Sequence, residues 1–218
     1  MKKTKIETNV DLDTDGQSDS LLWEIVKTVG VFLVAIIIFR FYIFQPFLVK
    51  GTSMEPNYHD GQYLVVNELA YHVGNPKRGD VVVFKHPEPA CTDFVESNYI
   101  NQVFLQGPCT NYIKRVIGLP GETVVVRDGK VFVKNADNPN GFQLNEDYIV
   151  AGTPTLGDQT KTLGKNEYFV LGDNRYPNAS SDSREWGVLP RKNITGKANF
   201  ILYPFSDLTV LHTATYSK

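Results

Sequence analysis

The distribution of apolar residues divides the chain into one long helix and a series of short strands. The segment IVKTVGVFLVAIIIFRFYIF has basic residues, Lys27 and Arg40, near its two ends and no charged residue between them. About 20 apolar residues of helix span a bilayer, and long basic side chains near the ends can reach the lipid headgroups. The pattern therefore predicts a single transmembrane anchor helix over residues 23–44. The missing polar face disfavours a buried core helix, and the following FQPFLVKG offers no small-residue site for a cleaved leader.

Short runs of β-branched and aromatic residues follow the helix and predict strands. They lie at residues 62–67, 80–84, 112–117, 123–127, 130–134, 168–171 and 198–203. Asp128-Gly129, between two of these runs, is a strong signal for a two-residue hairpin. We therefore predict a mainly β domain with antiparallel strands over residues 45–218.

Three further segments are polar and contain no strand pattern. Residues 1–22 are mostly polar and acidic, and they offer too little apolar surface to offset the entropy of ordering, so we predict a disordered tail. Residues of about 85–111 and 135–165 are rich in polar and turn-forming residues. We expect both to be surface insertions in the β domain.

Composition and charge exclude several classes of function. The 218 residues are 42% hydrophobic and carry a net charge of −2, which suits one folded domain with an appendage. No basic-aromatic patch points to a nucleic-acid partner. The four histidines form no HxxxH or HxH pair, and the two cysteines lack the spacing of a zinc site, so we predict no metal.

Two residues are candidates for nucleophilic catalysis. Ser53 lies in a turn-like stretch, VKGTSMEPNYHDGQYLVV, and a serine nucleophile needs a base. His59 has no evident orienting acid, but a lysine in a desolvated site loses its proton more easily and can act as a base. Strand alternation in NYIKRVIGLPG puts Lys114 on one face with Tyr112 and Val116, which could bury its amine. The alternative is a solvated strand lysine.

A third stretch, LGDNRYPNASSDSREWG, gathers many polar residues directly after a predicted strand. Asp182 and Arg184 could brace the turn with charge-assisted hydrogen bonds. A serine of this stretch could hold the lysine amine. The alternative is a plain surface loop.

Together the stretches resemble the sequence boxes of type I signal peptidases, which are membrane-bound Ser–Lys endopeptidases. GTSMEP resembles the serine box, RGDVVVF the strand box that follows, YIKRVIGLPGE the lysine box and GDNRYPNASSDSR the last box, in this order from about Phe44 to Tyr203. The resemblance implies a mainly β signal-peptidase domain that removes signal peptides from secretory preproteins. It also implies cleavage after small residues in Ala-x-Ala sites, with no cofactor.

The resemblance assigns roles to individual residues. Ser53 is expected to be the nucleophile and Lys114 the general base. Ser180 matches the serine that orients the lysine, although two extra residues before it leave Ser181 open. Many members have a serine at the position of Gly51, so the oxyanion hole is expected to use backbone N–H groups of Ser53 and Gly51, as in the short layout of Gram-positive members.

Two larger sets follow from the same resemblance. The substrate is expected to bind as an extended strand, and the residues expected to contact it are Phe47, Leu48, Val49, Met54, Tyr58, Tyr112 and Ile113. Support for the last box is expected from Asp173, Arg175, Asp182 and Arg184.

The resemblance also implies a location and partners. The expected arrangement is a single pass through the plasma membrane, with the N-terminus in the cytoplasm and a monomeric catalytic domain on the outer face. Partners would be the lipid bilayer and secretory preproteins. In an oxidising exterior Cys91 and Cys109 could form a disulfide, the alternative being two free thiols.

Two other functions stay open at this point. One is another Ser–Lys peptidase of similar fold, such as a LexA-type self-cleaving repressor. The other is a membrane-tethered, non-catalytic β module, which would explain the helix and the strands but gives no reason for the serine and lysine boxes.

Overall fold

A computed structural model describes residues 15–42, 45–89, 91, 109–211 and 213–216. The chain forms two compact units, residues 1–41 and 42–218. Residues 1–14 of the predicted disordered tail, and Phe44 at the end of the predicted anchor, lie outside the described residues. Residues 15–22 of the predicted tail are helical, since they belong to the first helix, which begins at Asp15.

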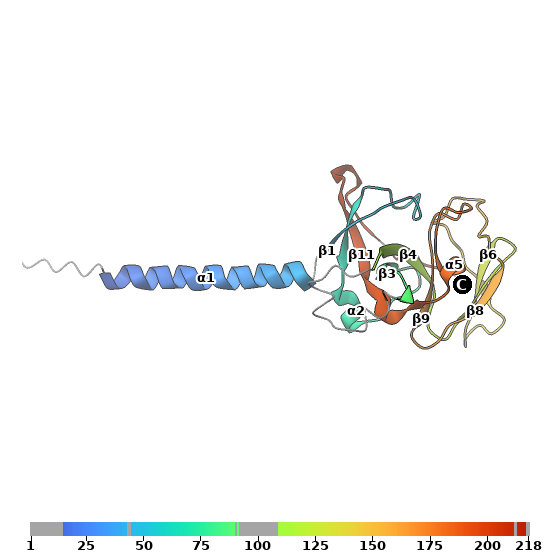
Figure 1. Ribbon diagram of the computed structural model, residues 1–218, viewed down its shortest axis with the longest axis horizontal. Coiled ribbons are helices and arrows are strands. Elements are labelled where there is room, and N and C mark those ends of the chain that lie inside the picture. Colours follow the sequence, from blue (N-terminus) through green and yellow to red (C-terminus); the bar gives the residue numbers. More distant parts are fainter. Residues whose placement is uncertain (1–14, 43–44, 90, 92–108, 212, 217–218) are drawn as a thin grey trace, which may run out of the picture. The chain divides into compact units, whose positions relative to one another are not determined.

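The first unit consists of the helix α1, Asp15–Tyr42 (Figure 1). Many of its large apolar side chains are more than half exposed: Leu21, Leu22, Trp23, Ile25, Val26, Val29, Val31, Phe32, Leu33, Val34 and Ile36. Measured over the described ranges, however, every helix falls short of the combined length and apolarity that a membrane span requires. The predicted helix is therefore present, but the structure does not identify it as a membrane span.

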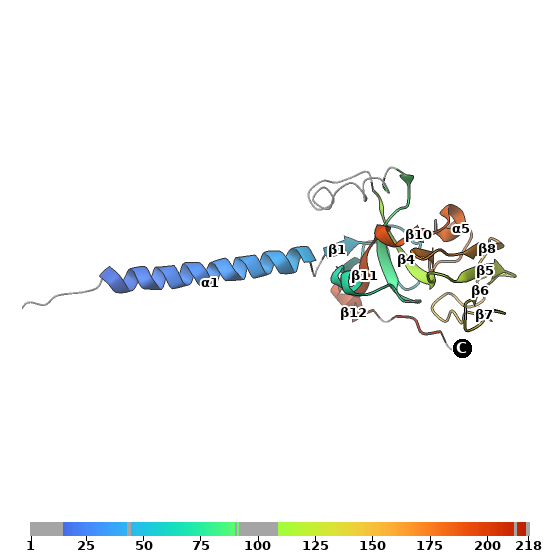
Figure 2. The ribbon, with the colours of Figure 1, turned by 90° about the horizontal axis from the view of Figure 1, so that it is seen from below.

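The second unit contains two antiparallel sheets (Figures 1 and 2). The larger has the strand order β1 (Gln45–Leu48), β2 (Tyr63–Asn67), β11 (Ile194–Tyr203), β3 (Val81–Lys85), β4 (Asn111–Gly118), β9 (Glu167–Leu171) and β10 (Leu189–Pro190), with β12 (Thr209–Val210) also paired to β11. The smaller has the order β7 (Phe142–Gln143), β6 (Lys130–Lys134), β5 (Thr123–Arg127) and β8 (Gln159–Thr162). Short helical elements complete the unit: α2 (Leu69–Val73), α5 (Ser183–Trp186), η1 (Arg191–Asn193) and η2 (Phe205–Asp207).

The predicted mainly β, antiparallel architecture is confirmed. All the predicted strands are present, as β2, β3, β4, β5, β6, β9 and β11, and the Asp128-Gly129 turn joins β5 to β6. Both turn residues have positive φ, 51° for Asp128 and 74° for Gly129, as this type of hairpin requires. The strands that were not predicted have two to four residues, which is too short for alternation to be visible.

The two predicted insertions are described to different extents. Most of the first lies outside the described residues, and its two ends are joined by a disulfide between Cys91 and Cys109. The second contains β7 and β8 and turns Leu144, Thr155 and Leu163 into the interior, each no more than 3% exposed. The second segment therefore contributes to the core as well as to the surface.

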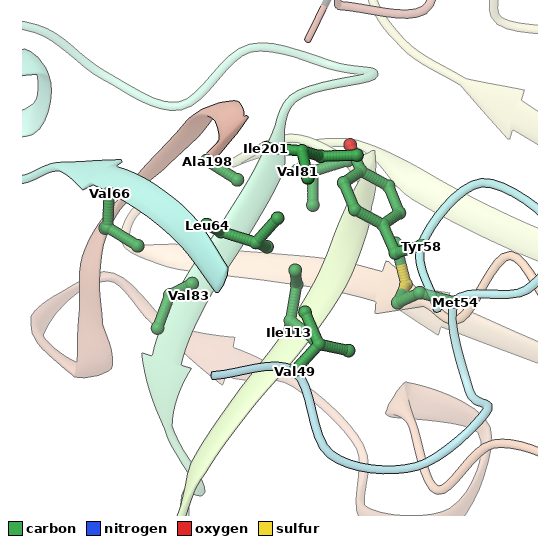
Figure 3. Close-up of a cluster of buried hydrophobic side chains, with 10 residues drawn as sticks. All are labelled: Val49, Met54, Tyr58, Leu64, Val66, Val81, Val83, Ile113, Ala198 and Ile201. Atoms are coloured by element: carbon green, nitrogen blue, oxygen red, sulfur yellow. The ribbon is translucent and has the colours of Figure 1, made fainter. Parts of the chain in front are cut away.

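Strand β4 borders all three clusters of buried apolar side chains. Ile113 belongs to the cluster formed with β2, β3 and β11, which Figure 3 shows. Ile117 belongs to the cluster beneath the small sheet, and Val116 to the cluster formed with Val82 and Phe84 of β3. Packing on both faces fixes β4 firmly, so a side chain that it carries has a well-defined position.

Candidate active site

Ser53 lies in a closed loop between β1 and β2. Backbone hydrogen bonds close the base of this loop, from Val49 N–H to the Gln62 carbonyl at 2.8 Å and from Gly61 N–H to the Val49 carbonyl at 3.0 Å. Within the loop the N–H groups of Asn57 and Tyr58 both donate to the Met54 carbonyl at 3.1 Å. The result is a compact turn with a half-buried serine near its tip.

Asn174, just beyond the end of β9, holds this turn. Its backbone N–H donates to the carbonyl oxygen of Ser53 at 3.1 Å, and its side-chain amide donates to the carbonyl oxygen of Thr52 at 2.9 Å. Gly172 makes this close approach possible, since a Cβ there would lie 2.4 Å from the Ser53 carbonyl oxygen. A glycine at this position therefore brings β9 and the serine turn together.

Lys114 reaches the serine from the middle of β4. The pairing of β4 with β3 places Lys114 opposite Val82, and its side chain is only 3% exposed. Its Nζ lies 2.6 Å from Ser53 Oγ and 2.9 Å from the Ile113 carbonyl oxygen. The predicted Ser–Lys contact is thus present in the structure, and the lysine is buried rather than solvated.

The environment of Lys114 favours the neutral amine. Burial lowers its pKa from 10.5 to about 8, although the negative charges of Asp182 and Asp173 act in the opposite direction. A neutral amine can accept the serine proton, whereas an ammonium cannot. The Lys114 amine therefore loses its proton more readily than an ordinary lysine.

The neighbouring residue, Arg115, points to the opposite face of β4 and remains charged. Its guanidinium makes a two-pronged contact with Asp173, with Nε–Oδ1 at 2.8 Å and Nη2–Oδ2 at 2.6 Å, and both side chains are buried. Asp173 is thus joined to β4, and the role predicted for it, support of the turn of the last box, stays a prediction. The alternation of the strand separates the Lys114 amine from this charged pair.

Ser180 and Asp182 lie beside Gly172. The Asp182 carboxylate accepts hydrogen bonds from the Ser180 hydroxyl at 2.9 Å and from the Gly172 N–H at 3.1 Å, and its Oδ2 contacts Arg184 Nη2 at 2.8 Å. Burial raises the pKa of Asp182, but the hydrogen bonds and charge of Arg184 outweigh this and hold the pKa below its ordinary value. Asp182 also caps α5 through the Arg184 N–H.

The lysine-orienting role predicted for Ser180 is not visible as a direct contact. Among the described residues, the hydrogen bonds of the Lys114 amine run to Ser53 and Ile113, and the Ser180 hydroxyl donates to Asp182. Ser180 still lies close to the dyad, because a Cβ on Gly172 would meet both Ser180 Oγ and the Ser53 carbonyl oxygen. The choice between Ser180 and Ser181 as the orienting group stays a prediction.

Arg175, for which a supporting role is predicted, points into the interior and has a partner that was not predicted. It is buried and contacts Glu146 Oε1 at 2.5 Å and the Gly172 carbonyl at 2.7 Å. Its guanidinium also donates to Thr155. Glu146 and Thr155 both come from the second predicted insertion, so this segment supplies the partners that hold Arg175 in the interior.

The predicted oxyanion donors differ in availability. The Gly51 N–H already donates to Asp60 Oδ1 at 2.6 Å, so the structure does not support Gly51 as a free donor. Gly51 has a φ of 85°, which suits glycine and which the Asp60 contact stabilises. The Ser53 N–H stays the predicted donor.

The predicted substrate-binding residues fall into two groups. Val49, Met54, Tyr58 and Ile113 are at most 4% exposed and lie in one apolar cluster with the partly buried Phe47, and Figure 3 shows the first four together. Tyr112 lies on the face of Lys114, with the lysine Nζ 5.5 Å from its ring centre. The clustered side chains are packed into the core beside the serine turn, and their contact with a substrate stays a prediction.

Phe47 and Leu48 lie on β1, an outer strand of the large sheet. β1 pairs with β2 through one edge, with Phe47 opposite Leu64, and no strand within the described residues pairs with its other edge. An outer strand presents unpaired backbone groups that an extended peptide can bind.

Four contributors were missed at the sequence level: Asn57, Asp60, Glu146 and Asn174. Asn174 lies inside a recognised box, and its position after a strand was the one signal for it. Asn57 and Glu146 have partners that are far away in the sequence, and the contact of Asp60 with Gly51 depends on the conformation of the loop. Sequence pattern alone therefore gives no reason to choose these three residues as site residues.

A serine hydroxyl 2.6 Å from a buried lysine amine is compatible with a hydrolase, and comparisons with known proteins identify the family. The family model described as "Signal peptidase, peptidase S26" matches residues 22–203. The chain therefore belongs to the S26 signal peptidase family and is a peptidase.

Curated relatives agree with this assignment. A signal peptidase I of Bacillus licheniformis is 33% identical over 197 residues, covering 86% of this chain and 91% of the relative. A signal peptidase I of Leptolyngbya laminosa is 36% identical over 192 residues, covering 88% of this chain and 85% of the relative. A solved structure of a signal peptidase I from Enterococcus faecalis is 28% identical, with a TM-score of 0.40, over 58% of this chain and 98% of that one.

Proposed function

We propose that this peptidase removes N-terminal signal peptides from exported preproteins by means of a Ser53–Lys114 dyad. The observation that carries the proposal is the distance of 2.6 Å between the hydroxyl oxygen and a desolvated amine. Family membership supports the same reaction, since the curated relatives are named signal peptidase I.

In the proposed mechanism, Ser53 Oγ attacks the carbonyl carbon of the scissile bond and its proton passes to the neutral Lys114 amine. The Ser53 N–H stabilises the oxyanion that forms. The Lys114 ammonium then protonates the departing amine as the C–N bond breaks, which leaves an acyl-enzyme. Water attacks the ester, Lys114 takes its proton, and the proton returns to Ser53 Oγ.

We further propose that the preprotein binds as an added strand along the open edge of β1. Main-chain hydrogen bonds would supply affinity, and small side chains at alternate positions would face the wall formed by Val49, Met54 and Ile113. Such a wall admits little volume, which favours alanine at both positions of an Ala-x-Ala site.

For location, we propose that α1 anchors the protein in the cell membrane, with the catalytic unit on the outer face. The support is the row of exposed apolar side chains on α1, since large exposed apolar surfaces mark protein or membrane contacts. The basic residues Lys27 and Arg40 near the ends of the apolar segment agree with this arrangement.

The test is cleavage of a preprotein with an Ala-x-Ala site by the detergent-solubilised full chain. We expect a cut after the second alanine, and a loss of roughly 10⁴-fold or more in both Ser53→Ala and Lys114→Arg, because a guanidinium cannot serve as a base. Matched controls are Ser206→Ala and Lys130→Arg, which change an exposed serine and an exposed strand lysine. An active Lys114→Arg variant would refute the dyad.

The same preparation separates the alternatives. Cleavage of the chain itself without added substrate, lost in Ser53→Ala, would favour a self-cleaving peptidase. Preprotein binding that is unchanged in a double variant of Ser53 and Lys114, with no cleavage by the wild type, would favour a non-catalytic module.

A further inference from the structure

A connected group of buried and half-buried polar side chains lies next to the serine turn and the lysine strand. It consists of Asn57 from the serine turn, Arg115 from β4, Asp173 from the end of β9 and Tyr148 from the second predicted insertion, and we call it the Asp173 node. We propose that Asn57 is a positioning residue, which uses this node to set the distance between the Ser53 hydroxyl and the Lys114 amine. The inference rests on the proposed function.

The contacts of Asn57 are specific to an amide. Its Nδ2 donates to Asp173 Oδ2 at 2.8 Å and to the backbone carbonyl oxygen of Tyr148 at 2.7 Å. An NH₂ group has two hydrogens and can satisfy both acceptors, whereas a hydroxyl has only one. Asp173 is fully buried and Asn57 is half-buried, so their hydrogen bond is partly shielded from water.

Asp173 connects the serine turn to the lysine strand, because it binds a residue of each. On one side it binds Asn57, which is four positions beyond Ser53 in the same compact turn. On the other side it binds Arg115 at 2.6 and 2.8 Å, and Arg115 is the residue directly after Lys114 on β4. A shift of Asn57 relative to Asp173 is therefore a shift of the serine turn relative to the lysine strand.

Tyr148 contacts the rest of the Asp173 node through Arg115 and connects it to Glu146. Its ring packs against the Arg115 guanidinium, with 4.2 Å between the guanidinium carbon and the ring centre, and its hydroxyl binds Glu146 at 2.6 Å. Glu146 in turn pairs with Arg175. The carbonyl that receives Asn57 is thus part of a connected and buried network rather than of a free loop.

Asn57 and Asn174 hold the serine turn from two sides. Asn174 binds the carbonyl oxygens of Thr52 and Ser53, and Asn57 fixes the turn after the serine. Two attachment points determine the orientation of the turn, while one would allow it to pivot. Both acceptors of the Asn57 amide are groups of the protein itself. The loss of Asn57 should therefore slow the chemical step and leave substrate binding intact.

The first experiment measures kcat and KM of the detergent-solubilised full chain with Asn57→Ala and Asn57→Asp. Asn57→Asp keeps the shape but turns a carboxylate toward Asp173. Because small displacements of reacting groups are costly, we expect kcat to fall roughly 10- to 100-fold in both, with KM within about twofold of the wild type. The matched control, Asn145→Ala, removes an exposed amide–carboxylate bond of 2.9 Å and should leave both constants unchanged.

A second measurement does not depend on preprotein cleavage. In a Ser53→Cys variant the nearby Lys114 should stabilise the thiolate, and iodoacetamide should alkylate it at pH 7 faster than an ordinary thiol. Adding Asn57→Ala should slow this alkylation by roughly tenfold, as the thiol leaves the amine. A slower rate without any wild-type cleavage would keep the Asn57 inference and reject the proposed function.

Two results would overturn the inference. One is an equal alkylation rate with and without Asn57, together with an unchanged kcat. The other is failure of both Asn57 variants to fold in thermal melts, which would assign the residue to stability and not to positioning.

Discussion

Replacing Lys114 with methionine should remove activity and yet stabilise the folded protein at neutral pH. Burial lowers the pKa of this lysine from 10.5 to about 8. At about 1.4 kcal/mol for each pH unit, the difference corresponds to about 3 kcal/mol that the fold loses by holding a charged ammonium. Methionine also gives up the contacts with Ser53 and the Ile113 carbonyl, which are worth about 1 kcal/mol each. The net gain expected for Lys114→Met at pH 7 is therefore about 1 kcal/mol.

The sign of this difference should reverse as the pH rises. The lysine pKa is lower in the folded than in the unfolded state, so the unfolded state holds more protons between pH 8 and 10.5. The wild type should accordingly gain stability relative to the variant across this window, by up to about 3 kcal/mol. Above it the wild type should be the more stable protein by about 2 kcal/mol, the value of the two hydrogen bonds.

The assay is denaturant unfolding in a non-ionic detergent, followed by tryptophan fluorescence at pH 7, 8, 9 and 10. Lys130→Met, which changes an exposed lysine on β6, is the matched control and should show no comparable change with pH. A stability difference between wild type and Lys114→Met that stays constant from pH 7 to 10 would show that the lysine is not desolvated. The proposed neutral base would then have no physical foundation.

Three further changes probe other parts of the site. Gly172→Ala should reduce activity by roughly 100-fold or more, because the new Cβ would lie 2.4 Å from the carbonyl oxygen of Ser53 and displace the serine turn. Normal cleavage by a folded Gly172→Ala variant would contradict this geometry. Asp60→Ala should lower kcat by about tenfold, since it removes the hydrogen bond that stabilises the positive-φ conformation of Gly51 in the serine turn, and Asp60→Asn should retain most activity because its amide oxygen still accepts; equal rates in the two variants would argue against the contact. Reduction of the disulfide, which spans 18 residues, should lower the free energy of unfolding by about 3 kcal/mol, and an unchanged melt after complete reduction, verified by mass, would rule this out.

Local pattern was sufficient for the strands. It named Ser53 and Lys114 as candidates but left a solvated lysine open, and the family resemblance supplied their roles. The alternation of β4 placed Lys114 with Tyr112 and Val116, and in the structure the lysine is buried on that face. Such a pattern depends only on neighbours within a few positions, so it can be read directly from the chain.

The contacts that support the site could not be predicted in this way. Asn57 meets Tyr148 and Asp173, which are 91 and 116 positions away in the sequence. Glu146 lies in a segment whose composition is typical of a surface loop, although it pairs with the buried Arg175. Which polar residue of a loop turns inward depends on the complete fold, because it requires a partner from a different element.

The adjacent placement of Lys114 and Arg115 has a consequence for how this protein can change over evolutionary time. One of the two must lose its charge readily and the other must keep it, and a single residue inserted into or removed from β4 would exchange their faces. Such a change would leave the arginine against the serine and the lysine against Asp173. A change in length before Lys114 within this strand should therefore be tolerated less well than a conservative apolar substitution. Variation in length should be tolerated better in the connections that flank it, among them the segment closed by the disulfide.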